Sequence, residues 1–254
     1  MFVVIDRVVT IAVVCLMASS ARAAGVPDDC TQLIVAVAPD WNSMHGRALL
    51  LERAGGIWKT DGKFFAVLFG KEGLAWGSGL AGQNESGLRK KERDGRAPAG
   101  IFRIGKVYTY DAQLPKGADY PFHQVTKADA WMDDVRSPQY NQLVTIDDPA
   151  HPPEWFEKQK MRHNDFAYRW LVEIRHNSDP PVPGNGSAIF FHIRRGVNRA
   201  TAGCTTMTEA DLVRVITWLR AGRNPCFALL PNEVYKEKWR EWKLPAPEIA
   251  GLQP

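Results

Sequence analysis

The chain has 254 residues, of which 45% are hydrophobic and 24% are charged. This composition suits one globular domain with at most a small appendage. The formal net charge is only +4, so the charge balance gives no reason to expect a polyanionic partner. The densest basic cluster, residues 89–96, is diluted by Glu92 and Asp94 and holds no aromatic residue. We therefore expect a solvated loop there and no nucleic-acid partner.

A short apolar run, residues 8–17, follows Arg7 near the N-terminus. It is too short to span a bilayer, which argues against a retained anchor. Ala21-Arg22-Ala23 then supplies the small-x-small pattern of a cleavage site. We expect residues 1–23 to be a signal peptide that is removed after Ala23. The sequence therefore predicts an exported protein with no membrane attachment after cleavage.

Most of the elements expected after the signal peptide are strands. Runs rich in β-branched, aromatic and other apolar residues, bounded by turn residues, predict strands at 33–38, 48–52, 64–69, 101–110, 168–174, 188–193 and 227–230. Residues 70–100 are Gly-rich and polar with no sustained period, which predicts a long loop. Such loops are uncommon without a function, so we expect this one to border a functional site. Residues 111–165 hold only short, scattered elements.

One helix is expected near the C-terminus. Thr208 is a plausible N-cap, with Asp211 three residues later as a weak capping-box partner, and Gly222 is a stop signal. Between them, apolar residues recur with helical spacing at Leu212, Val215, Ile216 and Leu219. Many strands and few helices predict a mainly β fold, a β-rich sandwich or an open barrel. We expect one domain over residues 24–231 and a C-terminal tail over 232–254.

The most informative stretch is residues 187–207, which read SAIFFHIRRGVNRATAGCTTM. An apolar run leads into His192, and Gly203 and Cys204 stand just before the expected helix. A cysteine thiol of pKa ~8.5 is only a few per cent ionised at neutral pH, so it needs a base such as histidine to act as a nucleophile. Spacing alone does not establish contact between the two residues. A buried histidine and a buried structural cysteine are therefore the alternative.

Two other motifs carry less weight. Residues 77–82 match G-x-G-x-x-G, but a loop-forming stretch follows where a dinucleotide site needs a helix. His163, His176 and His192 could bind zinc together with cysteines, yet no C-x-x-C or H-x-x-x-H spacing occurs. We therefore expect no cofactor and no metal.

Residues 187–207 resemble the L,D-transpeptidase catalytic domain family, also called YkuD-like, in which a histidine is followed by a connection and then Ser/Thr-x-Gly-Cys. Further segments resemble the family or one bacterial branch of it. They are residues 93–102, similar to "DG-x-TPAG-x-F"; Asp133-Asp134 with residues 137–141, similar to "DDP…S-x-x-YN"; and residues 183–187, similar to the lead-in to the catalytic strand. The resemblance covers roughly residues 32–231.

The resemblance implies a periplasmic enzyme that remodels the cell wall and so affects cell shape. Cys204 would attack the diamino-acid carbonyl of a peptidoglycan stem peptide, and an amine of a second stem would resolve the thioester. His192 would be the base, with its ring held by the main-chain carbonyl of Ile193. The amides of Gly203 and Cys204 are candidate oxyanion donors. Resolution by water, which makes a carboxypeptidase or amide hydrolase, and a non-catalytic wall-binding module are the alternatives.

Two departures from the family pattern affect specificity. Ala202 stands where most members have a second histidine, and Thr206 stands where most have an arginine. A substrate carboxylate would then need another cation. The nearest candidates are on the connection between His192 and Cys204, namely Arg194, Arg195 and Arg199. An exposed basic loop is the alternative interpretation of these three arginines.

Cleavage of the signal peptide would remove Cys15 and leave Cys30, Cys204 and Cys226. An odd number in an exported protein suggests one free thiol, and a nucleophile such as Cys204 must stay reduced. Cys30 and Cys226 are then available to form a disulfide between the start of the domain and its last strand. Two separate buried thiols are the alternative.

Overall fold

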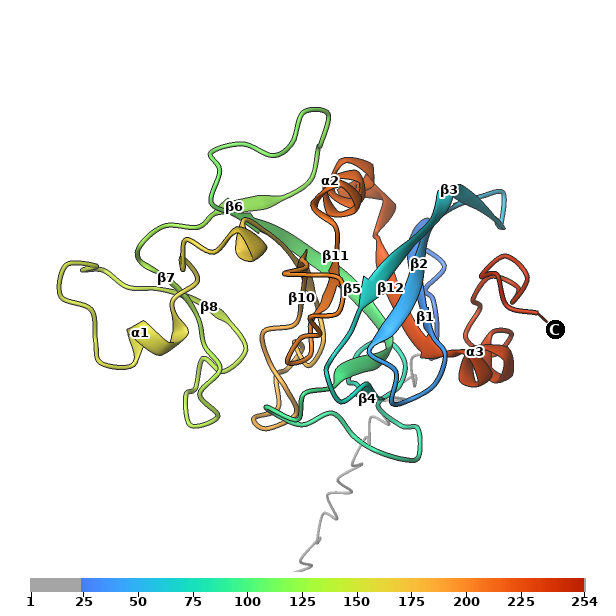
Figure 1. Ribbon diagram of the computed structural model, residues 1–254, viewed down its shortest axis with the longest axis horizontal. Helices are drawn as coiled ribbons and strands as arrows, with labels where there is room; N and C mark the ends of the chain where they lie inside the picture. Colours follow the sequence, from blue (N-terminus) through green and yellow to red (C-terminus); the bar gives the residue numbers. More distant parts are fainter. Residues whose placement is uncertain (1–23, 254) are drawn as a thin grey trace, which may run out of the picture.

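Eight strands close into a mixed β-barrel in the computed structural model, which describes residues 24–253 (Figure 1). The expected signal peptide lies outside the described residues. The strands follow one another around the barrel as β12 (Cys226–Pro231), β1 (Gln32–Ala38), β2 (His45–Ala54), β3 (Ile57–Leu68), β11 (Thr205–Met207), β10 (Phe190–Ile193), β9 (Trp170–Ile174) and β5 (Ala97–Thr109). Pairing of β5 with β12 closes the ring. The pairs β1–β12 and β10–β11 are parallel and the others antiparallel.

The other elements decorate this barrel. They are β4 (Leu74–Trp76) and β6 (Phe122–Gln124), which pair with β5; a hairpin of β7 (Asp129–Trp131) and β8 (Leu143–Thr145); the helices α1 (Phe156–Gln159), α2 (Glu209–Trp218) and α3 (Asn232–Lys238); and two short 3-10 turns, Phe166–Tyr168 and Ala221–Arg223. Figure 1 shows β7, β8 and α1 together on the left, beside β10. We call residues 111–165, which include these elements, the lobe.

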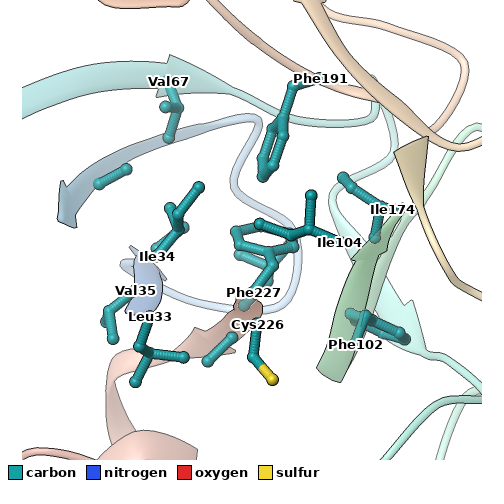
Figure 2. Packing of buried hydrophobic residues seen from close by; sticks show 14 of the residues in the cluster. Leu33, Ile34, Val35, Val67, Phe102, Ile104, Ile174, Phe191, Cys226 and Phe227 are labelled. Carbon is teal, nitrogen blue, oxygen red and sulfur yellow. The ribbon is translucent and has the colours of Figure 1, made fainter. Parts of the chain in front are cut away.

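The core fills the barrel interior and continues under α3. Every residue of β1 and of β12 is buried, because these neighbouring strands face the interior on one side and α3 on the other. Inside the barrel, the rings of Phe191 and Phe227 meet edge to face with centroids 4.7 Å apart (Figure 2). Such burial of large apolar side chains is the main stabilising contribution to the fold.

The predicted mainly β fold with few helices is confirmed. The α2 helix begins as expected, since the Thr208 side chain accepts a hydrogen bond from the Asp211 amide at 3.1 Å. It ends at Trp218, before the expected glycine stop. Apart from β6, β7 and β8, which lie where only short, scattered elements were expected, two strands were not expected. β4 lies within the predicted loop, and β11 is a polar three-residue strand directly after Cys204.

The segment that we expected to be a tail packs into the same core as the barrel. α3 contacts β1 and β12, and the Trp242 side chain is fully buried. The Trp242 carbonyl accepts a hydrogen bond of 2.9 Å from the Val26 amide, near the other end of the described chain. The C-terminal segment is therefore part of the domain's packing.

We expect Trp242→Ala to lower the free energy of unfolding by about 3–5 kcal/mol, because it leaves a large cavity in a packed core. Equilibrium denaturation measures this difference. The control is Ile57→Ala, since Ile57 is 65% exposed on a hairpin and its loss should cost little. Equal stability of Trp242→Ala and wild type would show that the C-terminal segment is dispensable.

Candidate active site

His192 and Cys204 line one cavity of about 210 Å³ between the barrel and the lobe. His192 lies on β10, and Cys204 immediately precedes β11. The two strands pair in parallel, and Thr206 of β11 is the partner of His192. The apolar wall of the cavity consists mainly of Trp131, Met161, Leu171, Ala188 and Phe190. Parallel pairing of two short strands thus brings together two residues that are twelve positions apart in the chain.

The His192 ring is held in one orientation. Its Nδ1 lies 3.0 Å from the Ile193 carbonyl oxygen, the contact that the resemblance implied. Since a carbonyl only accepts, Nδ1 carries the proton and Nε2 is left as an acceptor. Tyr168 packs edge-on against the same ring, with centroids 5.2 Å apart. Burial lowers the pKa of His192 to about 4, so the imidazole is neutral at pH 7.

The Cys204 thiol is also neutral at rest. Burial raises its pKa to about 11, against the smaller opposing effect of positive charge on Lys90 and Arg195. Its Sγ donates a weak hydrogen bond to the Ala188 carbonyl at 3.4 Å. The pair is therefore a thiol and a neutral imidazole, so the thiolate must form during attack by proton transfer to Nε2.

The backbone conformation of the loop before Cys204 requires a glycine at position 203. Gly203 has φ +155°, and a Cβ at this position would lie 2.9 Å from the Arg96 carbonyl oxygen. The Gly203 amide donates to Thr201 Oγ1 at 3.0 Å. Of the two expected oxyanion donors, the Gly203 amide thus already has an acceptor in the protein. The Cys204 amide has no acceptor within residues 24–253 and is the available donor.

None of the three arginines of the connection is among the residues that line the cavity. Arg195 donates to Asp165, with Nε at 3.1 Å, and its guanidinium lies 4.6 Å from the centre of the Tyr168 ring. Arg195 therefore supports the tyrosine that packs against His192, and its guanidinium group is already bound to Asp165. Arg194 is half-buried and Arg199 is exposed. Their binding of a substrate carboxylate stays a prediction.

Glu92, which no pattern in the sequence indicates, ties the 70–100 loop to Ser187, just before β10. Its Oε2 accepts hydrogen bonds from Ser187 Oγ, at 2.7 Å, and from the Tyr140 hydroxyl. The tyrosine and the serine belong to segments that carried the resemblance, but the glutamate is more than 40 positions from either. No local pattern in the sequence signals that pairing.

Asn141 is a second residue whose role only the structure reveals. Its Oδ1 accepts from the Ala188 amide at 3.0 Å and from Trp131 Nε1 at 3.0 Å. Its Nδ2 donates to the carbonyls of His176 and Asn177. Asn141 therefore fixes both the apolar wall of the cavity and Ala188, the residue whose carbonyl accepts from Cys204.

Cys30 and Cys226 are both buried, and the structure holds them as free thiols. They are neighbours, since a hydrogen bond with Cys226 is the main cause that lowers the pKa of Cys30. Figure 2 shows Cys226 beside Phe227 at the lower edge of the core. The expected disulfide is thus not formed in this structure, and its formation after export stays a prediction.

We expect oxidised protein to be about 5 kcal/mol more stable than a Cys30→Ser, Cys226→Ser double variant, because the disulfide would close a loop of nearly 200 residues. Non-reducing peptide mapping detects the bond, and denaturation with and without reductant measures its effect. Two free thiols in oxidised, exported protein would contradict the prediction.

Within residues 24–253 there is no helix long and apolar enough to cross a membrane. The same part of the chain contains no group of three or more His, Cys, Asp or Glu residues placed to hold a metal ion.

The closed mixed β-barrel brings a histidine and a cysteine to one cavity, and this is the residue pair that cysteine-dependent acyl-transfer enzymes use. A family model described as the L,D-transpeptidase catalytic domain (YkuD) matches residues 56–227, more than half of the chain. The chain therefore belongs to the L,D-transpeptidase catalytic domain family, whose members are typically cysteine-dependent L,D-transpeptidases acting on peptidoglycan stem peptides. Comparison with curated proteins and with solved structures gave no match.

Proposed function

We propose that this protein is an exported peptidoglycan L,D-transpeptidase that uses Cys204 as nucleophile. The observation that carries the proposal is the shared cavity of Cys204 and His192, with the imidazole Nε2 left free by the bond from Nδ1 to Ile193. Family membership supports the reaction class. Export rests on the N-terminal pattern at residues 1–23 and supports action in the periplasm.

The first half of the reaction forms a thioester. Cys204 Sγ bonds to the substrate carbonyl carbon while its proton moves to His192 Nε2. Negative charge develops on the carbonyl oxygen, and the Cys204 amide, which has no acceptor within residues 24–253, is the donor that would stabilise it. The carbon–nitrogen bond then breaks, and the imidazolium gives its proton to the leaving amine of the terminal D-amino acid.

In the second half, an amine from another stem attacks the thioester carbonyl and gives a proton to His192. The carbon–sulfur bond breaks, and the sulfur regains a proton from the imidazolium. The net result is exchange of one amide bond for another, with no oxidant or reductant consumed. The apolar wall formed by Trp131 and Phe190, whose rings are 4.9 Å apart, supports exclusion of water from the thioester.

The test is incubation of purified protein with defined tetrapeptide muropeptides, followed by mass spectrometry of protein and products. We expect a covalent adduct on Cys204 and cross-linked dimers. Tripeptides without dimers would instead identify a carboxypeptidase. No adduct with stems or with a carbapenem, together with retained binding to peptidoglycan, would identify a wall-binding module. Cleavage after Ala23 is checked by N-terminal sequencing of the exported protein.

A further inference from the structure

A second, larger cavity opens next to the catalytic one. It has a volume of about 710 Å³ and shares Asp133, Lys158 and Gln159 with the cavity that holds Cys204. Gln159 Nε2 donates to Asp133 Oδ1 at 2.6 Å, and Gln159 Oε1 accepts from the Asp133 amide at 2.8 Å. This reciprocal pair joins α1 to the loop before Arg136 and fixes the boundary between the two cavities. A ligand in the larger cavity would therefore lie beside the reacting cysteine.

Most charges that line the larger cavity are satisfied within the protein. Arg93 makes the weakest of these pairs, since its Nη2 lies 3.9 Å from Asp133 Oδ1 and its side chain is exposed. Arg136 forms a two-pronged pair with Asp134, through Nε at 3.0 Å and Nη2 at 2.7 Å. That pair lowers the pKa of Asp134 to about 2, so both members stay charged and bound to each other. Glu92 accepts from the hydroxyls of Tyr140 and Ser187. These groups have little capacity left for a ligand.

Two charged residues on the α1 wall are different. Within residues 24–253, neither Glu154 nor Lys158 has an ion-pair or side-chain hydrogen-bond partner, and both are exposed. They are four positions apart, yet they do not pair with each other. Lys158 lines both cavities, whereas Glu154 lines only the larger one. Trp155 lies half-buried on the same wall and offers an apolar surface.

We propose that the larger cavity binds a zwitterionic amino-acid end of the peptide substrate, with Lys158 holding its carboxylate and Glu154 its ammonium group. A free cation and a free anion on one wall that also carries an aromatic side chain are complementary to a group that carries both charges. Lys158 would then supply a cation for a substrate carboxylate, a role that Thr206 does not fill, and would be an alternative to the arginines of the connection. This inference rests on the proposed function for the identity of the peptide.

The test measures binding directly and does not need turnover. The protein carries Cys204→Ala to prevent reaction, and calorimetry gives the dissociation constants of three tetrapeptide stems. One has meso-diaminopimelate at the third residue, whose side chain ends in an ammonium and a carboxylate. The second has that side-chain carboxylate amidated, and the third has the side-chain amine acetylated.

We expect Lys158→Ala to weaken binding of the zwitterionic stem about fivefold, the upper range for an ion pair open to water, and to leave the amidated stem unchanged. Lys158→Arg should restore affinity. Glu154→Gln should weaken binding of the zwitterionic and amidated stems and leave the acetylated stem unchanged. Lys59→Ala, which removes another exposed lysine from a strand far along the barrel, is the matched control and should change nothing.

Equal effects of Lys158→Ala on all three stems, or no effect on any, would overturn the inference. The same holds if no stem binds to the Cys204→Ala protein. The proposed function is judged separately, by thioester formation and products with wild-type protein. Normal turnover without charge-dependent binding therefore rejects the subsite alone, and absence of any thioester rejects the transpeptidase.

Discussion

Replacing Cys204 with alanine is expected to abolish turnover of stem peptides and the mass shift on the protein. The thiol is the group that must form and release the acyl bond, and no other thiol of residues 24–253 lines the cavity. The change removes one sulfur atom from a half-buried position, so the barrel should fold normally. Activity is followed by product analysis, and folding by circular dichroism and thermal unfolding.

Cys30→Ala is the matched control for the loss of a thiol, compared with wild type under reducing conditions so that neither protein holds the Cys30–Cys226 disulfide. Cys30 is buried beside Cys226 and outside the cavity, so this variant should keep the adduct and the products. Full turnover by Cys204→Ala would reject the nucleophile. The same result for Cys204→Ser would also count against it, because a hydroxyl is far harder to ionise than a thiol.

The barrel could largely be predicted from the sequence because most of its strands contain apolar runs with clear ends. β3 is an exception, since its first half is mostly polar and exposed. β1 and β12 are buried on both sides and therefore consist almost wholly of apolar residues. β11 could not be found in this way, since Thr205 and Thr206 resemble loop residues until β10 and β3 pair with them. The C-terminal segment was separated from the domain for a similar reason. Its aromatic residues are spaced irregularly, and only tertiary packing shows that Trp242 is buried.

The presence of His192 and Cys204 in one cavity could be predicted because their signature is local in sequence. Their surroundings could not. Glu92 and Asn141 are tied to the segment before β10 from distant parts of the chain, through side-chain hydrogen bonds that leave no periodic pattern. Lys158 lines the cavity from α1, which also lies outside residues 187–207. The hydrogen bond from the Gly203 amide to Thr201 also could not be predicted from the sequence, since it depends on the orientation of the Thr201 hydroxyl. The protonation states also needed the structure, because they follow from burial.

Replacing His192 with alanine is expected to slow thioester formation by about 10²–10⁴-fold, the range for loss of a general base. The reason is specific to this site. With the pKa of Cys204 raised to about 11 by burial, very little thiolate is present at pH 7 unless Nε2 takes the proton. Stopped-flow acylation with a tetrapeptide stem or a carbapenem measures the rate. His163→Ala is the control. His163 lines the same cavity but is not the base proposed for Cys204, so loss of its imidazole should leave the rate of thioester formation unchanged.

The pH dependence of the acylation rate should further distinguish wild type from His192→Ala. In wild type, acylation requires neutral His192, whose pKa is lowered to about 4, so the rate should fall only as pH drops toward 4. It should be nearly constant from pH 6 to 9, since the base supplies the thiolate at each pH. In His192→Ala the rate should instead rise about tenfold per pH unit up to the thiol pKa near 11, because hydroxide must then remove the proton. If the acylation rate of wild type instead fell with a midpoint near neutral pH, the resting pair would be a thiolate and an imidazolium. That result would contradict a neutral thiol and a neutral imidazole at rest.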